Sequence, residues 1–207
     1  MAQSKSSKRW LREHFTDSYV KLARQNDYRS RAAYKLLEIQ QKDNIIRLGE
    51  VVVDLGAAPG GWSEVAAKLV GRIGKVFAVD ILPMKPIVGI EFIQGDFTKN
   101  EVLEALLDRL NKQSVDLVIS DMAPNISGIG VMDQTRGMYL VESAFDFAKR
   151  TLKPGGTFLV KVFQGKEFEA LLNKIKKSFA EVAILKPKAS RARSREIFLL
   201  AKGFKVI

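Results

Sequence analysis

The chain has 207 residues with a net charge of +11, and 46% of the residues are hydrophobic, so it is large enough to bury a core. It contains no cysteine and one histidine, His14, which excludes a disulfide scaffold and a thiolate nucleophile and leaves no basis for expecting a metal site. No apolar run approaches the roughly 18 residues that cross a bilayer, and no apolar segment follows the basic N-terminus as in a secretory signal. We therefore expect a cytoplasmic protein without a metal and without a membrane partner.

The positive charge is concentrated at the two ends of the chain. Residues 1–35 and residues 186–207 each carry a net charge of +6, whereas residues 36–185 carry −1. Both ends also contain aromatic or large apolar side chains, which a segment needed only for solubility would not require. This pattern favours a polyanionic partner held by both ends, and it favours nucleic acid over a membrane surface.

The N-terminal segment is interpreted as a basic extension. Residues 1–12 are rich in serine, lysine and arginine and contain no acid, so a mitochondrial transit peptide is an alternative to an arm that faces RNA. No internal repeat or low-complexity linker follows. We therefore divide the chain into an N-terminal extension, residues 1–28, and one domain, residues 29–207.

Helical and strand patterns alternate along this domain. A helix is expected over residues 30–42, with Ser30 as its N-cap, followed by strands and helices in turn. The expected strands are 51–55, 75–80, 91–94, 115–120, 157–163, 182–185 and 197–201, and the further helices are 62–70, 99–110, 137–152 and 167–179. Such alternation predicts a parallel α/β sheet with helices on both faces. The last two strands have no helix between them and are expected to form an antiparallel hairpin at the edge.

A glycine-rich turn follows the first strand, in the sequence DLGAAPGGW at residues 54–62. Turns of this kind let a ligand approach the backbone at the carboxyl edge of a parallel sheet. The turn is neither G-x-G-x-x-G nor a P-loop, and Pro59 lacks an N–H that a pyrophosphate would use. A nucleoside-like ligand without a pyrophosphate is therefore favoured over NAD or ATP, with a purely structural turn as the alternative.

Acidic residues stand at the ends of the next three strands. Asp80, Asp96 and Asp121 could each be a turn or capping residue, but together they should converge on one edge of the sheet. A carboxylate after the second strand can accept both hydroxyls of a ribose, and another can offset a positive charge on the ligand. These residues predict a site for S-adenosylmethionine.

Two lysines lie in unusual positions. Lys161 interrupts an apolar strand, where a charge is costly unless it is paired; the alternative is a side chain that reaches water at the strand end. Asp121 ends the neighbouring strand, Glu196 opens the last strand, and Lys35 lies on the first helix of the domain. These are the partners that a buried lysine would need.

Several motifs together resemble the FtsJ family of ribose 2′-O-methyltransferases over residues 10–203. They are RSR (29–31), DLGAAPGGW (54–62), SDMAPN (120–125), KVFQG (161–165) and SRARSRE (190–196). The resemblance implies a Rossmann-like class I methyltransferase fold, a seven-stranded mostly parallel sheet whose last strand is antiparallel. It also implies a catalytic tetrad, which falls on Lys35, Asp121, Lys161 and Glu196.

The resemblance further implies the binding residues. The cofactor site would be formed by Gly56, Ala58, Pro59, Gly60, Gly61, Trp62, Asp80, Asp96, Phe97 and Asp121, with Asp80 on the ribose and Asp96 at the adenine edge. The candidates for RNA phosphate contacts are Arg29, Arg31, Arg191, Arg193 and Arg195, each of which could instead form a surface ion pair of little energetic value. Lys161 would either accept the proton of the 2′-hydroxyl or stabilise the forming alkoxide.

The expected reaction is methyl transfer from S-adenosylmethionine to the ribose 2′-hydroxyl of a uridine in large-subunit (23S) ribosomal RNA, in the assembled 50S subunit. Within the family, the chain is most similar to the bacterial member that modifies this RNA, and no obligate protein partner is implied. Three alternatives stay open: transfer RNA as the substrate, a small molecule or protein as the methyl acceptor, and a non-catalytic RNA-binding factor.

Overall fold

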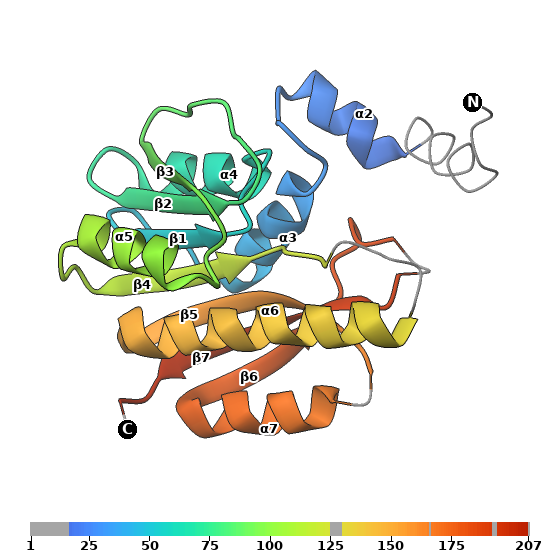
Figure 1. The fold of residues 1–207 in the computed structure, drawn as a ribbon. Helices are drawn as coiled ribbons and strands as arrows, with labels where there is room; N and C mark the ends of the chain where they lie inside the picture. Colours follow the sequence, from blue (N-terminus) through green and yellow to red (C-terminus); the bar gives the residue numbers. More distant parts are fainter. Residues whose placement is uncertain (1–16, 125–129, 166, 192–193, 207) are drawn as a thin grey trace.

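The computed structural model describes residues 17–124, 130–165, 167–191 and 194–206. Seven strands form one sheet in the order β3-β2-β1-β4-β5-β7-β6 (Figure 1). The strands are β1 Val51–Leu55, β2 Lys75–Asp80, β3 Ile90–Gln94, β4 Val115–Ser120, β5 Leu152–Phe163, β6 Phe179–Leu185 and β7 Glu196–Phe204. The helices are α2 Ser18–Gln25, α3 Ala33–Asp43, α4 Gly61–Val70, α5 Asn100–Leu110, α6 Gly130–Thr151 and α7 Phe168–Ser178.

The sheet is mostly parallel, as expected. Strands β1 to β5 pair in parallel with their neighbours, and β7 pairs antiparallel with both β5 and β6. The expected antiparallel pairing of the last two strands is therefore confirmed. It is β6, however, that forms the edge, because β7 inserts between β5 and β6.

Helices cover both faces of the sheet because the strands are apolar on both sides. Along β1, Val52 packs into the cluster beneath α3 and α4, whereas Val53 packs into the cluster beneath α5, α6 and α7. Along β5, Leu159 and Val160 divide in the same way. Successive side chains of a strand point to opposite faces, so a continuous run of valine, leucine and phenylalanine fills two cores.

Two boundaries differ by five residues or more from those expected, and the start of α3, the start of β6 and the end of β7 each differ by three. Helix α6 begins at Gly130 rather than at residue 137, and β5 begins at Leu152 rather than at residue 157. The Pro-Gly-Gly sequence at residues 154–156, between the expected helix and the expected strand, lies within β5. The pairing of β4 with β5 shifts register between Val115 and Leu117, opposite this sequence, and Gly155 has a positive φ of 80° that an irregular strand tolerates.

The expected capping of the first helix is wrong. The N-cap of α3 is Ala32, without a side-chain hydrogen bond, and the hydroxyl of Ser30 is buried with no hydrogen-bond partner among the described residues. Ser30 Oγ instead packs where a side chain at Gly61 would lie, so the start of α3 is seated against the glycine turn. Helix α2, which was not expected from the sequence, is capped by Asp17, whose Oδ1 accepts from the Tyr19 N–H at 3.0 Å.

Replacing Ile175 by alanine should lower the free energy of unfolding by about 2–5 kcal/mol, because this α7 side chain is fully buried and its removal leaves a cavity. The matched control is Ile184→Ala on β6, where half of the side chain is exposed and the change should stay within about 0.5 kcal/mol. Urea unfolding measures both, and equal losses would contradict this assignment of the core.

Candidate active site

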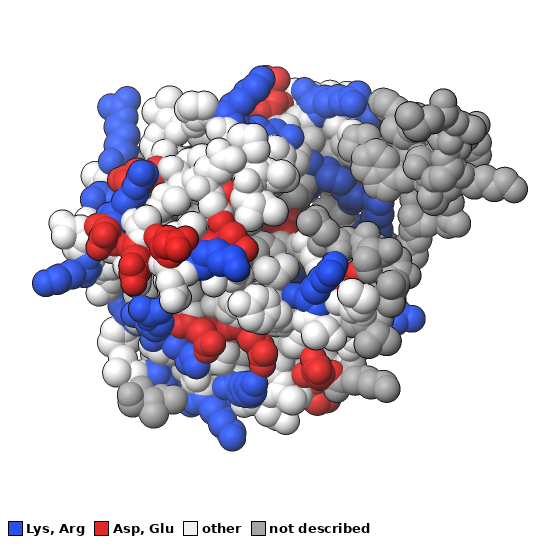
Figure 2. Space-filling model, in the orientation of Figure 1, with Lys and Arg blue, Asp and Glu red and all other residues white. Residues whose placement is uncertain are grey.

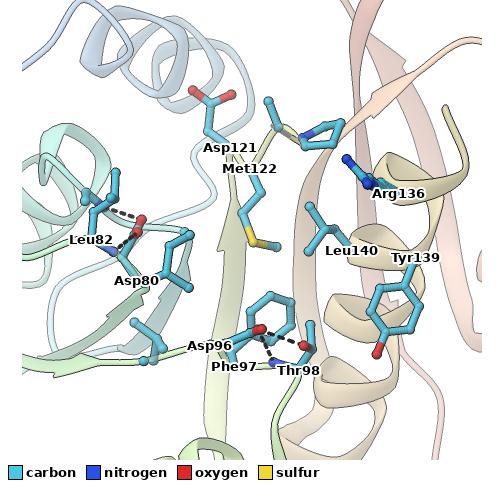
Figure 3. Close-up of a pocket in the computed structure, with 17 residues that line it drawn as sticks. Asp80, Leu82, Asp96, Phe97, Thr98, Asp121, Met122, Arg136, Tyr139 and Leu140 are labelled. Carbon is cyan, nitrogen blue, oxygen red and sulfur yellow. Dashed lines mark hydrogen bonds between the residues drawn. The ribbon is translucent and has the colours of Figure 1, made fainter. Parts of the chain in front are cut away.

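The carboxyl ends of the central parallel strands surround one cavity of about 510 Å³, which is the size of a small-molecule site (Figure 3). It is bounded by the glycine turn after β1, by the ends of β2, β3 and β4, and by one side of α6. The lining residues are Gly56, Ala58, Val79, Asp80, Ile81, Leu82, Gly95, Asp96, Phe97, Thr98, Asp121, Met122, Ala123, Pro124, Arg136, Tyr139 and Leu140.

The first glycine of the turn keeps this cavity open. Gly56 has a φ of 78°, and a Cβ placed on it would collide with the side chain of Met122 from the opposite wall. Any other residue would therefore be strained and would also displace Met122. The N–H groups of Gly56 and Ala57 both donate to the Val79 carbonyl, at 2.8 and 3.1 Å, which fixes the turn against β2.

The second half of the turn, residues 59–62, packs against neighbouring side chains and does not line the cavity. A Cβ on Gly60, which has a φ of 105°, would lie 2.7 Å from Ile87 Cδ1. The indole of Trp62 is buried against Phe198 and donates to the Ala32 carbonyl at 2.8 Å. Of the residues expected at the cofactor, Pro59, Gly60, Gly61 and Trp62 do not line the cavity, whereas Gly56, Ala58, Asp80, Asp96, Phe97 and Asp121 do.

Asp80 organises the loops on either side of it. One carboxylate oxygen accepts from the Ala58 N–H and the other from the Leu82 N–H, both at 2.8 Å. Each carboxylate oxygen has a second lone pair, so hydroxyl groups of a ligand can still be accepted. Asp96 is held in a similar manner by the N–H and hydroxyl of Thr98, which share its Oδ1 and leave Oδ2 available.

The four tetrad residues lie together beside this cavity, and Asp121 is the one that lines it. Lys161 Nζ is 2.9 Å from Asp121 Oδ1 and donates to the Asp121 carbonyl at 2.6 Å. Lys35 Nζ lies 3.3 Å from both carboxylate oxygens of Asp121 and 3.2 Å from Glu196 Oε1. The side chains are at most 15% exposed. Two ammonium groups and two carboxylates thus form one buried, connected network.

The charges within this network compensate one another. Burial raises the pKa of the Glu196 carboxyl, but the positive charges of Lys35 and Lys161 outweigh that effect, so the pKa lies below its usual value. Glu196 is therefore ionised at neutral pH. A buried charge is tolerated only when it is paired, and removing one member would leave its partner unpaired.

The described arginines expected to bind RNA differ in their surroundings. Arg29 donates to the carbonyls of Lys85 and Pro86, at 2.8 and 2.9 Å. Arg31 contacts Asp17 at 2.6 Å and donates to the Ala189 carbonyl, while Arg191 lies 3.7 Å from the same Asp17 carboxylate. The Arg195 side chain is exposed. Arg193 lies outside the described residues.

Comparison with known proteins identifies the chain. The model of the FtsJ-like methyltransferases matches residues 28–204. The ribosomal RNA large subunit methyltransferase E of Marinobacter nauticus is 58% identical over 206 residues, and the match covers all of both chains. The chain belongs to the FtsJ-like methyltransferase family.

Solved structures agree with this assignment to the FtsJ-like family. A chain from Plasmodium falciparum described as a ribosomal RNA methyltransferase has a TM-score of 0.76 at 31% identity, covering 86% of this chain and 98% of that one. A Streptococcus mutans protein described as a methyltransferase, in complex with SAH, shares the fold, with a TM-score of 0.52 at 13% identity, covering 84% and 96%. The Rossmann-like methyltransferase fold is therefore confirmed.

This FtsJ-like protein is a methyltransferase that uses S-adenosylmethionine, and the cavity fits that cofactor. When bound, S-adenosylmethionine supplies a methyl group on a positively charged sulfonium. The glycine at position 56 leaves room that a Cβ would fill, and the acids Asp80, Asp96 and Asp121 suit a cationic nucleoside. None of the helices that the described residues form is long and apolar enough to span a membrane.

Part of the cavity wall was not anticipated. Residues 136, 139 and 140 of α6 face the cavity with the i, i+3, i+4 spacing of one helix side, and Leu82 and Met122 complete the wall. This spacing in the sequence could have indicated that the three residues share one side of a helix. The expected helix began at residue 137, so Arg136 lay outside it, and the sequence did not show which side of α6 faces the cavity.

Asp54, at the end of β1, is a buried acid beneath the same turn. Burial raises its pKa to about 7, with smaller contributions from the charges of Asp121 and Asp80, against the opposing hydrogen bond that Ser63 donates at 2.6 Å. Between about pH 4 and about pH 7, the folded protein therefore keeps a proton on Asp54 that the unfolded chain, with a pKa of about 4, has released.

We expect this proton to make stability depend on pH. The contribution of Asp54 is fully present below about pH 4 and is lost as the pH rises to about 7, at a cost of a few kcal/mol. Asp54→Asn cannot titrate, so the wild type should lose stability relative to this variant between about pH 5 and about pH 8. Urea unfolding at both pH values measures the difference, and parallel pH dependence in the two proteins would contradict it.

Asp80→Ala should weaken cofactor binding by about tenfold or more, because two backbone N–H groups and the ligand hydroxyls lose their acceptor. Turnover at saturating cofactor should change much less. Calorimetric titration with S-adenosylmethionine measures the affinity. Asp108→Ala, at an exposed acid on α5, is the control and should bind normally. Unchanged affinity in Asp80→Ala would argue against this cavity as the cofactor site.

Proposed function

We propose that this chain methylates the ribose 2′-hydroxyl of a uridine in large-subunit (23S) ribosomal RNA, with the assembled 50S subunit as its substrate. The observation that carries the proposal is the buried lysine–carboxylate network at the cofactor cavity, in a chain 58% identical to a large-subunit ribosomal RNA methyltransferase. Such a substrate is found in the cytoplasm, which is the location that we propose.

Lys161 is proposed to act directly on the 2′-hydroxyl. A ribose hydroxyl is a poor nucleophile near neutrality, so methyl transfer requires its alignment and stabilisation of the negative charge that develops on its oxygen. Lys161 Nζ donates one of its three hydrogens to the Asp121 carbonyl and forms an ion pair with the Asp121 carboxylate. An ammonium group held in this way can still donate a hydrogen to the 2′-oxygen.

The other tetrad residues hold Lys161 in place. Asp121 contacts both lysines, and Glu196 contacts Lys35, so the four groups restrain one another. The ring of Phe198 lies 5.5 Å from Lys35 Nζ and forms the floor of the network. Lys35 and Glu196 are thus proposed to position the Asp121 carboxylate on which Lys161 depends.

Positive charge near the site supports RNA as the acceptor. On the face shown in Figure 2, lysines and arginines gather over α2 and beside it, whereas acids gather over α5. This distribution agrees with the basic ends of the chain and gives RNA a side from which to approach. We propose that residues 1–28 form an RNA-binding extension and that Arg193 and Arg195 contact phosphates.

Lys161→Ala should abolish methyl transfer while cofactor affinity stays within about threefold of wild type, because the residue acts on the hydroxyl and does not line the cavity. Transfer of labelled methyl groups from S-adenosylmethionine is measured with large ribosomal subunits, free 23S RNA, transfer RNA and protein as acceptors. Lys174→Ala, at an exposed α7 lysine paired with Glu142, is the matched control and should be fully active.

We expect label in the ribosomal substrates alone and the most in assembled subunits, on the 2′-oxygen of a uridine. Labelling of transfer RNA or protein by the wild type would overturn the proposed substrate. Near-normal turnover by Lys161→Ala would overturn the role assigned to Lys161.

A further inference from the structure

We propose that Arg136, on α6, binds the RNA phosphate next to the ribose that is methylated. This inference rests on the proposed function and adds a substrate contact from the middle of the chain, outside the two basic ends. It assigns to the α6 wall of the cavity the task of holding the target nucleotide while the opposite wall holds the cofactor.

Arg136 lies where such a contact is needed. Figure 3 shows it across the cavity from Asp121, with Tyr139 and Leu140 continuing along α6 toward Asp96. The next residue, Gly137, packs against the ends of β4 and β5. A Cβ on it would lie 3.5 Å from Pro124 Cγ and 3.8 Å from the ring of Phe163.

That packing links Arg136 to the catalytic lysine. The Phe163 ring also lies 6.0 Å from Lys161 Nζ, so the second turn of α6 and the reactive end of β5 rest on the same side chain. A Cβ at position 137 would make ordinary van der Waals contact with both side chains, so this part of α6 packs close to the residues that follow β4 and end β5. Arg136 therefore projects from the part of α6 that packs beside the site of methyl transfer.

Its guanidinium is available for a ligand. Arg29, Arg31 and Arg191 are already engaged by backbone carbonyls or by Asp17. Arg136 is exposed, and among the described residues it has no hydrogen-bond or ion-pair partner. A planar guanidinium with five N–H donors matches two oxygens of a phosphate, and nothing within the described part of the protein competes for it.

The chemistry of the substrate requires a cation at this place. The 3′-phosphate of a nucleotide is attached to the carbon adjacent to the one that bears the 2′-hydroxyl, so a phosphate must approach whenever that hydroxyl reaches Lys161. The carboxylates of Asp80, Asp96 and Asp121 that suit a cationic cofactor repel this phosphate. Among the described residues that line the cavity, Arg136 is the one with a positively charged side chain. Its charge offsets the repulsion between these carboxylates and the phosphate.

The test compares Arg136→Gln with Arg150→Gln. Arg150 is an exposed arginine in the last turn of the same helix, about 21 Å away along its axis, so the two variants lose the same charge at different distances from the site. Methyl transfer to large-subunit ribosomal RNA is measured over a range of salt concentrations, and S-adenosylmethionine affinity is measured by calorimetry. Thermal unfolding of both variants reports on the fold.

We expect Arg136→Gln to lower kcat/KM for RNA at least tenfold and to reduce the slope of log KM against log salt by about 0.7 to 1, the value for one phosphate contact. Cofactor affinity and the melting temperature should equal those of wild type, and Arg150→Gln should behave as wild type throughout. Arg136→Lys keeps the charge but not the planar fork, so it should restore the salt slope and only part of the lost activity.

Several results would overturn the inference. An unchanged salt slope and KM in Arg136→Gln would exclude the phosphate contact, and so would a loss of RNA activity in Arg150→Gln of the same size. Weaker S-adenosylmethionine binding would show that Arg136 serves the cofactor carboxylate instead. A wild-type protein that methylates no ribosomal RNA would refute the proposed function itself, which is a different outcome from a fully active Arg136→Gln.

Discussion

The carboxylate of Asp121 contacts two ammonium groups, those of Lys35 and Lys161. Keeping this contact buried constrains how α3, β4 and β5 pack together. Lys161 reaches the carboxylate at 2.9 Å from the neighbouring strand, and Lys35 reaches it at 3.3 Å from a helix that precedes the sheet. Charges removed from water are costly, and the cost is offset only when each has a partner at short range. The helix and the strands must therefore meet with little freedom.

The antiparallel insertion of β7 supplies the fourth charge. In the pairing of β5 with β7, Glu196 stands opposite Phe163 and Phe198 stands opposite Lys161. This register places the Glu196 carboxylate 3.2 Å from Lys35 and sets the Phe198 ring beneath the same amine. Trp62 also packs on Phe198 and is hydrogen-bonded to Ala32, three positions before Lys35. The glycine turn and the lysine network are thus connected through one aromatic contact.

Much of this architecture could be predicted because the strands are short apolar runs bounded by glycine or acids. The spans of β1, β2 and β4 agree with the expected residues, and the acids that end β2 and β4 lie at the cavity as expected. The tetrad itself came from the resemblance, since nothing local to residue 35 indicates that its amine will meet β4.

What could not be predicted depends on tertiary contacts. Trp62 was expected at the cofactor, but its size and its indole N–H are used in the core, which no local pattern reveals. Arg31 was expected to face RNA, yet its ion pair is with Asp17, at the start of a helix that was not foreseen. The hydroxyl of Ser30 was expected to cap a helix and instead packs against Gly61. In each case the partner comes from elsewhere in the chain.

The place of β7 in the sheet also governs the order in which the protein can be completed during synthesis. Strand β6 leaves the translating ribosome before β7, but its hydrogen-bonding partner in the sheet is β7 alone. Until β7 emerges, β5 presents a free edge, β6 has no strand beside it, and Lys35 lacks the carboxylate of Glu196. A nascent chain that stops short of residue 196 therefore lacks both the strand that joins β5 to β6 and the second carboxylate of the lysine network.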